Sequence, residues 1–123
     1  MEKEPVRLII DDALAIIRLD HNDTRNALSQ SMIQHIGAAL KSCEKRNIRA
    51  VYITGTGPAF CSGADVKALV QQLETGGPDA LSVYIQSLAD SLHNEVIIPI
   101  RMLNKPVIAA VNGVAAGAGF SLA

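Results

Sequence analysis

The stretch that decides the fold is Gly55-Thr56-Gly57-Pro58-Ala59-Phe60-Cys61-Ser62-Gly63-Ala64-Asp65. It follows a run of β-forming residues and precedes a segment with helical periodicity, so we interpret it as a turn that joins a strand to a helix. Its glycines permit positive φ angles and close backbone approach, and Pro58 stiffens it. Unpaired N–H groups at such a helix start suit a ligand oxygen that carries or develops negative charge. An ordinary strand-to-helix connection is the alternative.

A second turn of the same kind lies downstream. We expect a buried strand over 106–111, a turn at Asn112-Gly113, and a helix that begins within Gly117-Ala118-Gly119-Phe120. Turns that follow the strands of an α/β layer gather at one edge, so one backbone N–H from each turn could converge on a single oxygen. This is the geometry of an oxyanion hole, in which each donor is worth roughly 3 to 4 kcal/mol. Neither turn has the spacing of a P-loop or of a dinucleotide-binding fingerprint.

The remaining pattern predicts an alternation of strands and helices. Turn residues and apolar runs predict a hairpin of strands 6–10 and 14–19 around Asp11-Asp12, a loop over 21–25 and a buried strand 50–54. A helix should run from Ser29 to about Arg46, with Asn47 left-handed after it and an apolar stripe made of Met32, Ile33, Ile36, Leu40 and Cys43. After the strand 50–54 we expect a helix 65–73, a flexible loop 75–78, and a long helix capped by Asp79 that Pro99 kinks or ends near Ile98, with the stripe Leu81, Ile85, Leu88, Leu92 and Val96. This order predicts one α/β domain over residues 1–123.

Composition narrows the functional classes. The chain has 123 residues, 11 basic and 12 acidic side chains, and few aromatic residues, so neither a basic groove nor a base-stacking platform for nucleic acid is indicated. The amino terminus shows no secretory signal, and two cysteines make no disulfide framework, which favours the reducing cytoplasm. Residues 106–123 carry no charge, but Asn112 and three glycines argue against a membrane span.

Three motifs together resemble the enoyl-CoA hydratase/isomerase (crotonase) family. They are Arg25-Asn26-Ala27-Leu28, then Ile53-Thr54-Gly55 through Phe60-Cys61-Ser62-Gly63-Ala64-Asp65-Val66-Lys67, then Asn104-Lys105-Pro106-Val107-Ile108-Ala109-Ala110-Val111-Asn112-Gly113-Val114-Ala115-Ala116-Gly117-Ala118-Gly119. The resemblance extends over nearly the whole chain. It implies a crotonase-like ββα spiral, truncated before the carboxy-terminal helical part of the family.

The resemblance also implies an activity and a site. Family members bind acyl-CoA thioesters and stabilise an enolate with two backbone N–H groups, which correspond here to Ala64 and Ala118. By the same resemblance the residues that would contact substrate or CoA are Arg25, Ala27, Ser62, Ala64, Asp65, Val66, Lys67 and Ala118, with Lys67 near a phosphate. No separate cofactor or metal is expected, because CoA is part of the substrate. Family members are homo-oligomers, trimers or hexamers.

Two departures from the family pattern matter. Ser121 stands where hydratases have a glutamate, and a serine hydroxyl lacks the basicity of a general base. The second acidic position of the family would follow Ala123. We therefore expect part of an isomerase or a related enolate-forming enzyme, rather than a two-glutamate hydratase, whose base lies outside this sequence. The alternative is a non-catalytic acyl-CoA binder or a truncated interaction module. A half-sheet would also expose edges and apolar faces, so we expect self-association.

Single side chains allow two interpretations each. Cys61 could be a nucleophile, but a packing role is favoured because no histidine is near it in sequence. Asp65 could be a catalytic acid, but its position at a helix start favours capping. The three histidines, His21, His35 and His93, lack the spacing of metal ligands.

Overall fold

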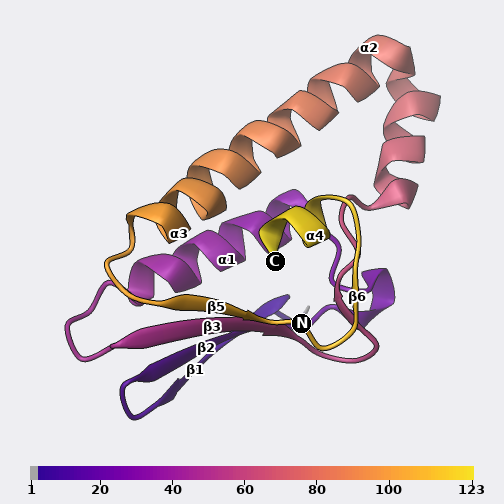
Figure 1. Ribbon diagram of the computed structural model, residues 1–123. Coiled ribbons are helices and arrows are strands. Elements are labelled where there is room, and N and C mark those ends of the chain that lie inside the picture. Colours follow the sequence, from indigo (N-terminus) through magenta and orange to yellow (C-terminus); the bar gives the residue numbers. More distant parts are fainter. Residues whose placement is uncertain (1–2) are drawn as a thin grey trace.

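The computed structural model describes residues 3–123, and its centre is a four-stranded sheet with the order β1-β2-β3-β5 (Figure 1). β1 and β2 are antiparallel, while β3 runs parallel to β2 and to β5. The strands are β1 Val6–Asp11, β2 Leu14–Leu19, β3 Ala50–Gly55 and β5 Val107–Ala110. The predicted hairpin is confirmed, although Asp11 still pairs with Leu14 and the turn is made by Asp12, at a φ of 55°, and Ala13.

Helix α1, Gln30–Ser42, covers one face of the sheet and separates it from the long helix α2 (Figure 1). Ser29 caps it as predicted, because its side chain accepts a hydrogen bond from the Met32 N–H at 3.1 Å. The predicted apolar stripe is buried along its whole length and consists of Met32, Ile33, Ile36, Leu40 and Cys43. Together with β2 and β3 this stripe forms the core of the protein.

The predicted end of α1 at Arg46 is wrong by four residues. The helix ends at Ser42, and the following turns carry Ile48 into the core, where it is only 2% exposed. The Lys105 ammonium donates hydrogen bonds to the carbonyl oxygens of Cys43 and Lys45 just past this end. Asn47 is not left-handed either, since Asp12, Arg25 and Asn26 are the described non-glycine residues with positive φ.

The predicted loop over 75–78 is a sharp bend within one helix instead. α2 spans Val66–Leu92, and Gly77 is its only residue with non-helical angles, at φ 78° and ψ −173°. Pro78 follows immediately, and proline is favoured in the first turn of a helix, so the second leg starts without a loop. Asp79 therefore lies inside this leg (Figure 1).

The long helix does not end where Pro99 enters it. A π-helical turn, His93–Ile97, connects α2 to α3, Ile98–Met102, so the chain stays helical past the proline. Proline has no backbone N–H to donate. Pro99 lies in the first turn of α3, where a residue needs no such hydrogen bond.

Two short strands were not predicted. β4, Ala59–Cys61, and β6, Val114–Ala115, form a separate parallel pair. Their three and two residues are too few to show a periodicity in the sequence. Helix α4, Ala118–Leu122, follows as predicted, and a 3₁₀ turn, Asn22–Thr24, lies within the predicted loop 21–25.

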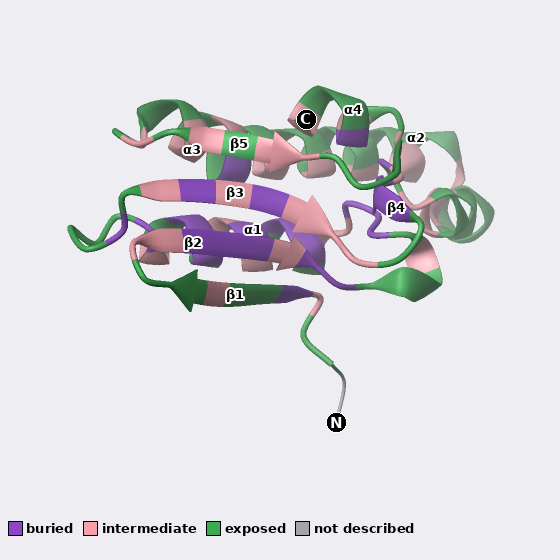
Figure 2. Ribbon diagram, turned by 60° about the horizontal axis from the view of Figure 1, so that its bottom comes forward, coloured by how far each residue is buried: buried purple, intermediate pink, exposed green. Residues whose placement is uncertain are grey.

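The strand over 106–111 was predicted to be buried, and this is wrong for the described chain. β5 lies at the edge of the sheet, and Ile108 is 58% exposed (Figure 2). Helix α2 has no buried residue, although Leu88 and Leu92 of its predicted stripe pack against the core. No helix within residues 3–123 combines the length and the apolar character needed to cross a membrane.

Candidate functional site

The first predicted donor, Ala64, lies in the short connection between β4 and α2. Gly63 precedes it with a φ of 89°, which an L-residue rarely adopts. Asp65 follows and caps α2, because its Oδ1 accepts a hydrogen bond from the Lys67 N–H at 3.1 Å. Capping was the favoured interpretation of Asp65. Within residues 3–123 no oxygen accepts a hydrogen bond from the Ala64 N–H, so this donor is available to a ligand.

The second predicted donor, Ala118, is the first residue of α4. Gly117 precedes it at φ 54° and ψ −128°, so the chain turns sharply at this point. The N–H groups of Gly119 and Phe120 donate to the carbonyl oxygens of Ala116 and Gly117 at 2.9 and 3.1 Å. The Ala118 N–H has no such acceptor among the residues that the structure describes.

The structure brings these two turns together. A methyl group placed on Gly63 would lie 3.4 Å from the Ala118 nitrogen and 2.6 Å from the Ala116 oxygen. Ala64 and Ala118 also line the same apolar pocket of about 240 Å³, whose other walls are Leu28, Ile33, Leu69, Ile85, Leu88, Ala89 and Leu92. The two donor turns therefore meet at a cavity lined by aliphatic side chains.

A polar pocket of about 410 Å³ adjoins the first donor. It is lined by Asp23, Thr24, Arg25, Ala27, Ser62, Ala64, Asp65, Val66 and Lys67. All the residues predicted to bind CoA except Ala118 thus share this pocket, and Ala64 lines both cavities. The side chains of Arg25 and Lys67 bring positive charge to it, while Asp65 is engaged as a helix cap.

The loop that carries Arg25 is fixed by backbone contacts to the first donor turn. Arg25 and Asn26 both have positive φ, at 55° and 60°. The Ser62 N–H donates to the Arg25 oxygen at 3.1 Å, and the Leu28 N–H donates to the Gly63 oxygen at 2.8 Å. The Ser62 hydroxyl adds a hydrogen bond to the Thr24 oxygen at 2.8 Å. Arg25 and Ala27 are therefore held beside Ala64 although they are distant from it in sequence.

The sequence profile of the family described as enoyl-CoA hydratase/isomerase matches residues 10–123. The chain belongs to the enoyl-CoA hydratase/isomerase family. Its sequence is 37% identical, over 122 residues, to a probable enoyl-CoA hydratase of Mycobacterium tuberculosis, and the match covers 98% of this chain and 44% of that protein.

Solved structures agree on the fold. An enoyl-CoA hydratase from a Polaromonas species superposes with a TM-score of 0.79 at 37% identity, over 95% of this chain and 44% of that one. A Pseudomonas aeruginosa protein gives a TM-score of 0.84 at 31% identity, over 100% and 50% of the two chains. The crotonase-like fold is thereby confirmed. The chain spans about half the length of the relatives that it matches, or somewhat less.

Among residues 3–123, no Asp or Glu side chain lines the apolar pocket. Ser121 is an exposed residue of α4. The polar pocket does contain Asp23 and Asp65.

Cys61 is buried completely in β4, in agreement with a packing role. Burial raises the pKa of its thiol, and a hydrogen bond from the backbone of Gly63 opposes that effect in part. A raised pKa lowers the fraction of the nucleophilic thiolate at neutral pH.

The sequence pattern gave no sign that the side chains of Asn26 and Asn112 bind the backbone of the first donor turn. Both are quoted in the family motifs, but neither was given a role. Asn26 is fully buried, and a polar amide next to the apolar Ala27-Leu28 was the signal that could have revealed it.

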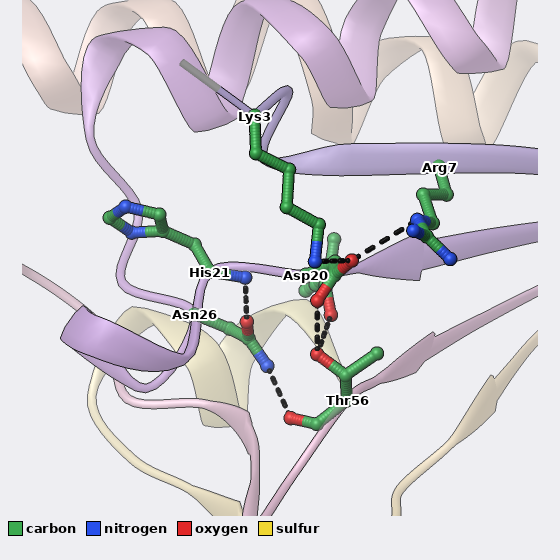
Figure 3. Close-up of polar contacts among 7 residues, drawn as sticks. Lys3, Arg7, Asp20, His21, Asn26 and Thr56 are labelled. Carbon is green, nitrogen blue, oxygen red and sulfur yellow. Dashed lines mark hydrogen bonds and ion pairs between the residues drawn. The ribbon is translucent and has the colours of Figure 1, made fainter. Parts of the chain in front are cut away.

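Asp20 connects the first donor turn, at Thr56, to two basic side chains, Lys3 and Arg7 (Figure 3). Its carboxylate lies 2.7 Å from the Lys3 ammonium and 3.2 Å from the Arg7 guanidinium, and it accepts a hydrogen bond from the Thr56 hydroxyl at 2.9 Å. The hydrogen bond from Lys3 is the main reason that the pKa of Asp20 is lowered, although burial acts in the opposite direction. The charged form of Asp20 thus ties the turn to the amino-terminal strand.

Proposed function

We propose that this chain binds acyl-CoA thioesters and that the N–H groups of Ala64 and Ala118 stabilise the oxygen of an enolate. The observation that carries the proposal is that two N–H donors, which have no acceptor among residues 3–123, belong to adjacent turns and line the same apolar pocket. Removing a proton α to a thioester places negative charge on the carbonyl oxygen. Two fixed donors that face this oxygen lower the cost of forming that charge.

The two pockets suit the two ends of such a ligand. The aliphatic pocket of about 240 Å³ offers a place for the acyl chain, because it is lined by leucine, isoleucine and alanine side chains. The polar pocket with Arg25 and Lys67 offers positive charge to the phosphates of CoA. Since Ala64 lines both, the thioester would lie between them. The proposed chemistry uses no cofactor other than the CoA group of the substrate.

The proton acceptor of the reaction is not assigned within residues 3–123. Ser121 lacks the necessary basicity, and Asp65 is used as a cap. We propose that the enzyme carries out isomerisation or related enolate chemistry with a base from outside these residues, and that it works as a homo-oligomer. The second candidate function is acyl-CoA binding without catalysis, which the absence of a carboxylate from the described lining of the apolar pocket favours.

A matched pair of ligands tests the donors. Octanoyl-CoA and its thioether analogue, which lacks the carbonyl oxygen, are titrated calorimetrically into the folded chain. Two hydrogen bonds of about 1 kcal/mol each should favour the thioester by about thirtyfold. Ala64→Pro removes one N–H and should reduce the preference to about fivefold, whereas Ala64→Ser keeps the N–H and serves as the control. Equal affinity for both ligands, or no binding of either, would contradict the proposal.

A further inference from the structure

Asn112 links the two donor turns through its side chain. It follows β5 and lies on the path to Ala118, yet all three of its side-chain hydrogen bonds go to the other turn. Its Oδ1 accepts from the Gly55 N–H at 2.9 Å. Its Nδ2 donates to the oxygens of Gly57 and Ala59 at 3.2 and 3.1 Å. The amide therefore satisfies one donor and two acceptors of the turn that leads to Ala64.

The Ala59 carbonyl is shared by a second amide. The Nδ2 of Asn26 donates to the same Ala59 oxygen at 3.1 Å, and also to the oxygens of Thr56 and Phe60 at 3.2 and 3.3 Å. The Oδ1 of Asn26 accepts from the His21 N–H at 2.7 Å (Figure 3). Asn26 comes from the loop of the polar pocket, so Ala59 joins this loop, the first donor turn and, through Asn112, the second donor turn.

Asn112 is also next to the point where the backbones of the two turns begin to pair. The Val114 N–H donates to the Pro58 oxygen at 3.3 Å, and the Ala116 N–H donates to the Cys61 oxygen at 3.1 Å. A methyl group on Gly113 would lie 2.2 Å from the Pro58 oxygen, so the neighbouring residue leaves no free space. A shift of Asn112 would therefore be passed along β6 to Ala118.

We propose that Asn112 is a positioning residue that sets the separation of the Ala64 and Ala118 N–H groups. This inference rests on the proposed function, because it assigns a role to those groups. Asn112 contacts neither pocket itself, and it acts through the Ala59 carbonyl and the pairing of β4 with β6. Loss of its amide would leave both N–H donors in place but no longer aimed at one oxygen.

The stretching frequency of the thioester carbonyl shows whether both N–H groups point at its oxygen. Octanoyl-CoA labelled with ¹³C at the carbonyl is bound to the chain, and the carbonyl stretch is measured by isotope-difference infrared spectroscopy. Donation by two N–H groups should lower its frequency relative to the free ligand. We expect Asn112→Ala to lose at least half of this shift, while affinity for CoA without an acyl group changes less than twofold.

Two further variants sharpen the result. Asn112→Asp can still accept from the Gly55 N–H but cannot donate to Gly57 and Ala59, so it should lose the shift as Asn112→Ala does. Asn47→Ala removes an exposed asparagine from the turn after α1 and should retain the full shift. A full shift in folded Asn112→Ala or Asn112→Asp would overturn the proposal.

Amide hydrogen exchange tests the linkage without any ligand. The N–H groups of Val114 and Ala116 should exchange at least tenfold faster in Asn112→Ala, while that of Ile16 in β2 should not change. Unchanged exchange at Val114 and Ala116 would overturn the positioning role. A lack of any carbonyl shift in the unsubstituted chain would instead contradict the proposed function, and the exchange rates would still decide whether Asn112 holds the turns together.

Discussion

At the meeting of the two donor turns the backbones are so close that a methyl group on Gly113 would lie 2.2 Å from the Pro58 oxygen, whereas α2 runs for 27 residues without a buried side chain. We call the first region, residues 55–64 and 112–118, the donor junction. Its geometry is fixed by contacts within the described chain. The wall of the apolar pocket that α2 provides has much weaker packing. The comparison teaches that the position of the two N–H groups and the shape of the apolar pocket are controlled separately.

The largest effect is expected from a methyl group in the donor junction. In Gly55→Ala the new Cβ would lie 2.5 and 2.7 Å from the oxygens of Ala59 and Phe60, which are backbone atoms and cannot move aside cheaply. We expect the free energy of unfolding to fall by about 3 kcal/mol, as in severe overpacking. Urea denaturation followed by circular dichroism measures it.

Gly77→Ala is the matched control in α2. Apart from its chain neighbours and the nearby helix backbone, no described atom lies within 4 Å of the new methyl group, so the positive φ of 78° is the main obstacle to it. We expect a loss of about 1 kcal/mol, because the strain is offset in part by the lower entropy of the unfolded chain. A loss in Gly77→Ala as large as that in Gly55→Ala would break the comparison.

The next largest effect concerns the apolar pocket of about 240 Å³. Ala89 lies on the exposed surface of α2 and lines this pocket. In Ala89→Phe the ring should displace about two methylene groups of a long acyl chain, and at about 0.8 kcal/mol for each group the affinity for octanoyl-CoA should fall about fifteenfold. Calorimetry with butyryl-CoA is the control, because the shorter chain should not reach the ring. Equal losses for both ligands would contradict the assignment of the pocket.

A smaller effect is expected from Asp20. Its pKa in the folded chain is lowered from 3.8, so the stabilisation by its charged form is complete above that value and is lost as the pH falls through the lower, folded-state pKa. Asp20→Asn should therefore be less stable than the unsubstituted chain near pH 6, and the difference should shrink below pH 4. Urea denaturation over this range measures it.

The smallest effect is expected on the exposed face of α2. Val83 is 70% exposed, so Val83→Ser should change the free energy of unfolding by less than about 0.5 kcal/mol. A loss above 1 kcal/mol would show that α2 is packed against something, such as a second copy of the chain. Light scattering would then reveal the self-association that the exposed apolar side chains predict.

The sequence was sufficient to predict the hairpin, the cap and buried stripe of α1, strand β3, and the helix starts after Asp65 and Gly117. These features depend on local signals, namely alternation, helical periodicity and turn residues. The family resemblance supplied the candidate residues, and the structure places seven of the eight around one pocket and Ala118 at the adjoining one. Their roles in binding and catalysis stay predictions.

Features that depend on distant contacts were not predictable in this way. Ser42 ends α1 because Ile48 packs into the core and Lys105 binds the carbonyl oxygens beyond the helix, and neither is visible in the helical pattern itself. Gly55 was expected to permit positive φ and close backbone approach, and among the described glycines the positive φ angles belong to Gly57, Gly63, Gly77 and Gly117. The close approach of Gly55 is confirmed, but its partner, Ala59, is revealed only by the folded chain.

The parallel pairing of β4 with β6 has a consequence for the order of folding. Asn112 bonds to Gly57 across a sequence separation of 55 residues, and most of the intervening chain is the bent helix α2 and its continuation. The entropy of closing this long loop must be overcome before the pairing gives any stabilisation. The hairpin and α1 can form from contacts that are closer in sequence. The two donors would therefore come together late, on a scaffold that is already in place.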